Sequence, residues 1–88
     1  KLVDKAAPEE TINNIKNIIN KTEGVLEIDM VKTRMFGSKI YVDVEFKCDE
    51  NLMLKEAHQI AENVHDRIEK EIPDVKHCMV HINPLEIK

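Results

Sequence analysis

The amino-acid sequence predicts a small α+β domain with two helices on one face of a three-stranded mixed sheet. Two segments repeat apolar residues at helical spacing, and three alternate apolar and polar residues as half-buried strands do. Their order along the chain is helix, strand, strand, helix, strand. At 88 residues, the chain fits one domain with a modest core.

The first helix is expected to span Pro8 to about Glu23. Pro8 sacrifices only an N–H that has no partner in a first helical turn, and the two glutamates after it favour the positive end of the helix dipole. Gly24 can adopt the left-handed conformation that ends many helices. Isoleucines recur between them at steps of three and four, at Ile12, Ile15, Ile18 and Ile19.

A hairpin is predicted next, because two alternating segments flank a turn at Gly37. In the first, residues 25–35, the inward side chains are expected to be Leu26, Ile28 and Met30, and the outward ones Glu27, Asp29, Val31 and Thr33. In the second, residues 39–47, the inward ones are expected to be Ile40, Val42, Val44 and Phe46, and the outward ones Tyr41, Asp43 and Glu45.

The second helix and the last strand complete the domain. The helix lies within residues 51–72, ends before Pro73, and carries an apolar stripe of Leu54, Ala57, Ala61, Val64 and Ile68. The strand turns Cys78, Val80 and Ile82 inward and His77, Met79 and His81 outward, and ends at Asn83 and Pro84. A right-handed crossover sets it parallel to the second strand, which is a ferredoxin-like arrangement. The domain is expected over residues 8–84, with a lead of 1–7 and a tail of 85–88.

Composition excludes several classes of function. A net charge of −4 without a basic tract, and only three aromatic residues (Phe36, Tyr41 and Phe46), argue against nucleic-acid binding. Cys48 and Cys78 form neither a disulfide framework nor a Cys-x-x-Cys site, which fits a reducing compartment. No apolar run is long enough to span a bilayer. The start lacks an initiator methionine and a signal-peptide core, so a fragment of a longer protein is expected.

The outward face of the sheet is where ligand-type residues gather. It is expected to carry Glu27, Asp29, Asp43, Glu45, His77 and His81 beside the apolar Val31, Tyr41 and Met79. Apolar side chains amid polar ones often mark a partner surface, and a homodimer is the commonest partner. Imidazole and carboxylate groups together suit zinc and neighbouring transition ions. Taken singly, however, a histidine among charged residues, such as His65 beside Glu62, is more often simply solvated.

Three stretches of sequence resemble a known family. They are EGVLEIDMVKTRMFGSKIYVDVEF, EAHQIAENVHDRIEKEIPDV and VHINP, in that order. Together they resemble the cytoplasmic C-terminal domain of cation diffusion facilitator transporters, over about residues 8–84. The order and spacing of the motifs carry the resemblance, since each motif alone is loose.

The resemblance implies the cytosolic part of a membrane-embedded efflux transporter. Such domains pair into a dimer and bind zinc or a related ion at and near the interface. The histidine of the E-A-H motif falls on His58 and that of the V-H-x-x-P motif on His81. Asn83 stands where members can have Asp, and Asp29 and Glu45 stand where they can have His, so the site is expected to be richer in oxygen. His77 joins these five candidates by its outward position alone.

Two other classes of function stay open at this point. A free-standing metal chaperone or small-ligand sensor would share the fold, although a chaperone would normally show a Cys-x-x-Cys in its first loop. An enzyme such as a small hydrolase would need a nucleophile and a base in one pocket, and no spacing of Ser, Cys or carboxylates in the sequence indicates that. The residues therefore favour a non-enzymatic domain, and the resemblance implies a place on the cytoplasmic side of a membrane.

Overall fold

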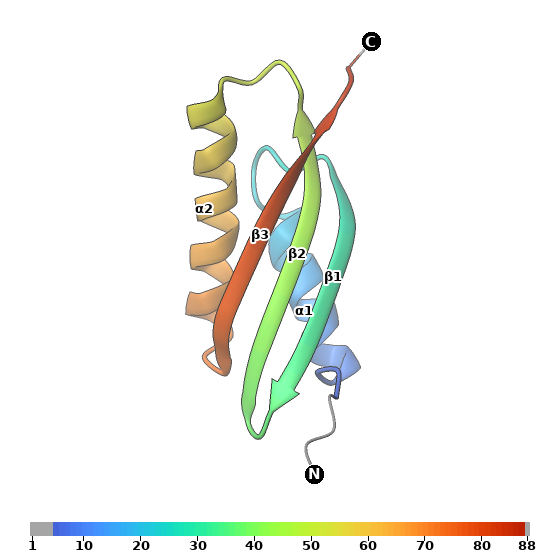
Figure 1. The fold of residues 1–88 in the computed structure, drawn as a ribbon, viewed down its shortest axis with the longest axis vertical. Coiled ribbons are helices and arrows are strands. Elements are labelled where there is room, and N and C mark those ends of the chain that lie inside the picture. The colour runs from blue at the N-terminus through green and yellow to red at the C-terminus, as the bar shows by residue number, and fades with distance from the viewer. Residues whose placement is uncertain (1–4, 88) are drawn as a thin grey trace.

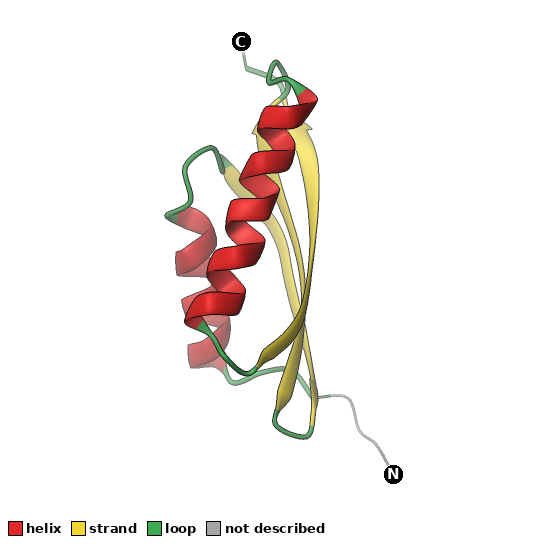
Figure 2. Cartoon of the chain, turned by 90° about the vertical axis from the view of Figure 1, so that its left-hand side faces the viewer, coloured by secondary structure: helices red, strands yellow, loops and turns green. Residues whose placement is uncertain are grey.

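The computed structural model describes residues 5–87 and confirms the predicted fold. The elements are α1 (Glu9–Asn20), β1 (Glu27–Phe36), β2 (Lys39–Asp49), α2 (Leu54–Glu71) and β3 (Val75–Leu85). β2 lies in the centre of the sheet, antiparallel to β1 and parallel to β3 (Figure 1). Both helices cover the same face, so the other face of the sheet has no covering layer within residues 5–87 (Figure 2).

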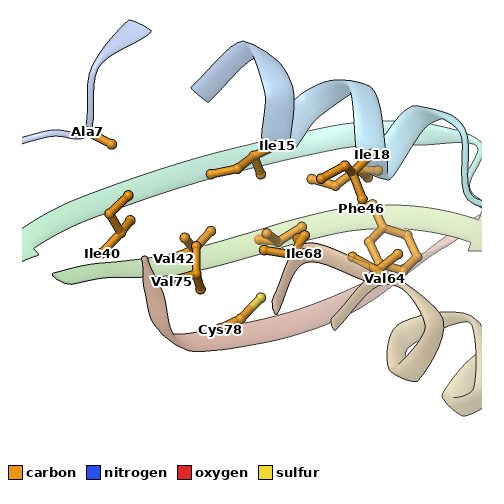
Figure 3. Packing of buried hydrophobic residues seen from close by; sticks show 12 residues of the cluster. Ala7, Ile15, Ile18, Ile40, Val42, Phe46, Val64, Ile68, Val75 and Cys78 are labelled. Atoms are coloured by element: carbon orange, nitrogen blue, oxygen red, sulfur yellow. The ribbon is translucent and has the colours of Figure 1, made fainter. Parts of the chain in front are cut away.

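The core lies between β2 and the two helices. Val42, Val44 and Phe46 of β2 have at most 1% of their surface exposed, as expected from their alternation. They pack with Ile15 of α1 and Ile68 of α2, which are fully buried (Figure 3). The apolar side chains of β2 and those of the helices thus fix which side of β2 faces the helices. The residues of β2 between them in sequence must then face outward.

The helix ends differ from the sequence-based expectation. α1 ends at Asn20 rather than near Glu23, because residues 21–24 form a turn that leads to β1. The apolar stripe of α2 begins at Ala57 and not at Leu54, whose side chain is 86% exposed. Leu54 is the first residue of the helix. The Arg67 guanidinium donates to Thr22 Oγ1 over 3.3 Å and so joins α2 to the turn that follows α1.

The predicted facing of β1 is wrong after Ile28, because the strand contains a β-bulge. Asp29 has no backbone register partner in β2, and the pairing of the two strands resumes with Met30 opposite Glu45. One extra residue exchanges the two faces of all that follows. Met30 therefore faces outward, while Val31 and Thr33 face the core opposite Val44 and Val42. Leu26, also expected inside, precedes the strand and is 49% exposed.

The segments at both ends of the expected domain contact it. Ala7, placed in the lead, is buried, and its N–H donates to the buried Thr33 Oγ1 over 2.8 Å. Lys5 pairs with Met35 of β1, while residues 1–4 and 88 lie outside the described part of the chain. β3 continues through Pro84 to Leu85. Proline is accommodated there because β3 is an edge strand.

Gly24 provides the first test of this packing. Its φ is +97°, and a Cβ there would lie 2.4 Å from Ile60 Cδ1 of α2. Gly24→Ala is therefore expected to cost about 2–4 kcal/mol of unfolding free energy, from backbone strain and overpacking together. Gly37→Ala is the matched control, because its φ is +62° but no atom lies within 4 Å of the added Cβ. Urea denaturation that gave equal losses for both variants would contradict the proposed Ile60 contact.

Candidate functional site

The outward face of the sheet is organised in rows of side chains across the three strands. Neighbouring strands lie about 4.8 Å apart, so residues paired in register are neighbours on this face. The row nearest the end of β3 contains Glu27, Lys47 and Asn83, and the next contains Met30, Glu45 and His81. Two further rows hold Lys32, Asp43 and Met79, then Arg34, Tyr41 and His77. The expected outward residues of β2 and β3 are thus confirmed.

Three of the predicted ligand residues come together around the bulge. Asn83 Nδ2 donates to Asp29 Oδ2 over 2.8 Å and to Glu45 Oε1 over 3.1 Å. The sequence expectation grouped Asp29, Glu45 and Asn83, and they meet because the bulge places Asp29 between the first two rows. His81 is the register partner of Glu45 on the same face.

Lys47 is the member of this cluster that sequence reasoning missed. Its Nζ lies 2.6 Å from Asp29 Oδ1 and 3.4 Å from Glu27 Oε2. The hydrogen bond from Lys47 is the main reason that the pKa of Asp29 is lowered, and the bond from Asn83 adds to it. The same bond to Asp29 raises the pKa of Lys47. The alternation of β2 could have predicted this position of Lys47, because it turns Lys47 outward beside Glu45.

Two predicted ligands lie away from this cluster. His58 is on α2, on the helix side of the sheet, where it borders a hollow lined by the inward-facing Cys48 and Ile82. Its Nε2 lies 3.3 Å from Glu62 Oε1, and its side chain is 72% exposed. His77 shares the outward face with His81 but lies four residues back along β3, about 13 Å away at the usual rise of a strand. Its ring packs at 5.7 Å from that of Tyr41.

Within one copy of residues 5–87, the donors do not form a complete metal site. No three side chains of the His, Cys, Asp and Glu types converge there in a ligand geometry. Both Asp29 oxygens already accept hydrogen bonds, one from Lys47 and one from Asn83. The thiols do not contribute, because Cys48 and Cys78 are buried in the core and burial raises the pKa of Cys78 to about 12. Any metal held by this face would need ligands from a second copy or a rearrangement of the cluster.

Away from this cluster, the outward face carries exposed apolar and aromatic side chains among the charged ones. Phe36 and Tyr41 meet edge to face with ring centroids 4.8 Å apart. They are 39% and 37% exposed, and Met79, one row along, is 46% exposed. This surface, defined by Phe36, Tyr41 and Met79, lies on the face without a helical layer, so it can contact another molecule without any change in the fold.

Comparison with known proteins gives consistent matches. A family model described as the cytoplasmic domain of cation efflux proteins matches residues 7–85. The chain is 30% identical over 83 residues to manganese efflux system protein MneP of Bacillus subtilis, and 32% identical over 83 residues to metal tolerance protein 3 of Oryza sativa subsp. japonica. These matches cover 94% and 93% of this chain, but only 28% and 20% of those two proteins.

Solved structures show the same fold at lower sequence identity. A nickel form of the MamM CTD is 22% identical, with a TM-score of 0.86 over 90% of this chain and 100% of that one. A cadmium form of the MamM CTD is also 22% identical, with a TM-score of 0.85 over 89% of this chain and 98% of that one. In the described part of this chain, neither helix has the length and apolar character needed to cross a bilayer.

The Asp29 and Lys47 pair predicts a specific loss of stability in acid. Because the pKa of Asp29 is lowered on folding, its contribution is present above the ordinary carboxyl value and is lost as the pH falls through the lowered value. Asp29→Asn is expected to flatten the dependence of the urea midpoint on pH below the ordinary carboxyl pKa of about 4. Lys47→Gln should flatten it similarly, since the main cause of the lowered pKa is then removed. An unchanged slope in both variants would disprove the pairing.

Proposed function

Because this chain belongs to the family of cytoplasmic domains of cation efflux proteins, we propose that it is the metal-responsive dimerisation domain of a divalent-cation efflux transporter. The family match confirms the resemblance noted from the sequence motifs. The family is one of transport and not of catalysis. The chain spans about a fifth to just over a quarter of the length of the relatives described above. A membrane part with the transport path, and a location on the cytoplasmic side of a membrane, are therefore parts of this proposal.

The single observation that carries the proposal is the uncovered outward face of the sheet. It combines an exposed apolar surface with carboxylate and imidazole groups at one end. A surface of this kind suits a two-fold dimer, in which both copies use the same patch and every contact between two residues occurs twice. The apolar residues would supply affinity, and the charged end would make the affinity depend on cations.

Metal would act by changing the repulsion between two such faces. Each copy has a formal net charge of −4, and Glu27, Asp29 and Glu45 gather at one end of the face around Lys47, which leaves an excess of negative charge there. Bringing two of these ends together is unfavourable unless a cation is shared. An ion that binds the closed pair more tightly than the open one must shift the population toward closure. In the transporter, closure of the paired domains would favour export when metal is abundant.

The proposed ligand set draws on both sides of the sheet. His81, Glu45, Asp29 and Asn83 would contribute from one outward face. His58 lies on the helix side of the sheet, so in a dimer joined through the outward faces it would hold metal at a separate site. His77 is the weakest candidate, since it lies among the aromatic residues.

Ligand chemistry supports a divalent transition ion without choosing one. The imidazoles suit Zn²⁺, which is the expectation from the sequence, whereas an oxygen-rich set also suits Mn²⁺. The name of the Bacillus subtilis relative refers to manganese efflux, and the MamM CTD has been solved in nickel and cadmium forms. We therefore propose that Zn²⁺ and Mn²⁺ both be titrated.

Removal of the proposed imidazole ligands tests metal binding. His81→Ala and His58→Ala are each expected to weaken Zn²⁺ binding at least about tenfold and Mn²⁺ binding less, because imidazole is the softer ligand. Calorimetry gives the affinity, and sedimentation with and without metal gives the association. His65→Ala is the control, because this side chain pairs with Asp66 and Glu69 of its own helix. Unchanged affinity and association in both His81→Ala and His58→Ala would refute the proposed site.

A charge placed on the apolar surface tests the proposed interface. Met79→Glu is expected to raise the dimer dissociation constant at least about tenfold, because the new carboxylate would be buried in the interface beside Asp43, its register partner. Met53→Glu is the matched control, since Met53 is 66% exposed but lies before α2, away from the outward face. Sedimentation equilibrium measures both constants. Equal effects, or an effect of Met53→Glu alone, would place the interface elsewhere.

A further inference from the structure

The place of a cation in the carboxylate cluster is taken by a side chain of the protein itself. Lys47 Nζ contacts Asp29 and Glu27, with the shorter distance of 2.6 Å to Asp29 Oδ1. The Asn83 amide bridges the remaining Asp29 oxygen and Glu45. A positive charge and amide donors thus hold the oxygens of these carboxylates together.

We propose that Lys47 and Asn83 act as a built-in substitute for a metal ion, so that a divalent cation can use the Asp29 carboxylate only by displacing the Lys47 ammonium. This inference rests on the proposed metal response of the same face. In this inference, Lys47 would set the metal concentration at which the paired domains close. Lys47 is a determinant of affinity in this proposal and not a ligand.

Two physical effects make Lys47 a competitor. The ammonium occupies an oxygen that the metal would need, and a hydrogen bond between two charged groups is among the stronger ones in proteins. It also places a positive charge within a few ångströms of any ion that approaches Asp29, where the repulsion between like charges is only partly screened. The Lys47 side chain is 29% exposed and that of Asp29 20%, so the pair is partly shielded from solvent.

The position of Lys47 in the fold keeps it in the cluster. It is the register partner of both Glu27 in β1 and Asn83 in β3, so it is the middle residue of its row. Its backbone carbonyl also accepts a hydrogen bond of 2.9 Å from Leu26 N–H. The backbone of Lys47 is therefore fixed in the central strand, and only its side chain can move aside to admit a metal.

Removal of the ammonium tests the inference. Lys47→Met keeps an unbranched side chain without the ammonium and is expected to tighten the binding of Mn²⁺ and Zn²⁺ at least about tenfold by calorimetry. Lys47→Gln is a second variant in case Lys47→Met fails to fold. Lys32→Met is the matched control, because Lys32 faces outward from β1, two rows from Glu27, opposite Asp43. It removes the same charge from the same face.

A double variant locates the gained affinity. In Lys47→Met combined with Asp29→Asn, the gain is expected to disappear, because the oxygen that Lys47 released is no longer charged. The inference is overturned if Lys47→Met tightens binding no more than Lys32→Met, which would indicate a general charge effect. It is overturned too if the gain persists without the Asp29 carboxylate, because the metal then uses other ligands.

The same titrations separate this inference from the proposed function. If the native chain binds no metal but Lys47→Met does, the metal response proposed for the native domain fails while the role of Lys47 stands. If the native chain binds metal through His81 and Lys47→Met changes nothing, the proposed function stands and the inference about Lys47 is wrong.

Discussion

Burial of one side of the central strand is the constraint from which the outward face follows. Val42, Val44 and Phe46 lose nearly all contact with solvent beneath the two helices. Successive side chains of a strand point to opposite faces of the sheet, so Glu45 and Lys47 must face outward. The hairpin and the parallel β3 then bring their own side chains into register with this row. The chemistry of the outer face is therefore positioned by apolar packing on the inner one.

The bulge in β1 gives Asp29 a position that a regular sheet would not provide. A continuous alternation would have put Met30 in the core and Val31 on the surface. The extra residue instead returns β-branched side chains to the core and leaves Asp29 free to lean toward Lys47 and Asn83. Bulges commonly redirect a side chain toward a functional site, and this one brings a carboxylate to the cation side chain. The bulge disrupts the pairing of β1 with β2 only locally, because the pairing resumes at the next residue.

Patterns with a strong period could be predicted from the sequence, and the fold follows from them. β2, β3 and the stripe of α2 after Ala57 were predictable because each repeats over several positions. The bulge was not, since one inserted residue leaves both alternations plausible when Met30 and Val31 are both apolar. Asp29, Glu45 and Asn83 were grouped by resemblance, but the partner Lys47 was overlooked because a lysine on an outward face usually points to solvent. The position of His58 across the sheet from His81 follows from two confirmed predictions, both helices on one face and His81 on the other.

The separation of Asp29 and Asn83 along the chain has a consequence for how the domain forms. These residues are 54 positions apart, whereas Asp29 and Lys47 are 18 apart and belong to one hairpin. Local pairings close sooner than distant ones, because the entropy of loop closure must be overcome before a distant contact forms. The hairpin can thus neutralise Asp29 before β3 has docked through its crossover. In this order of folding, Lys47 neutralises the Asp29 carboxylate first, and Asn83 contacts it only when β3 has paired with β2.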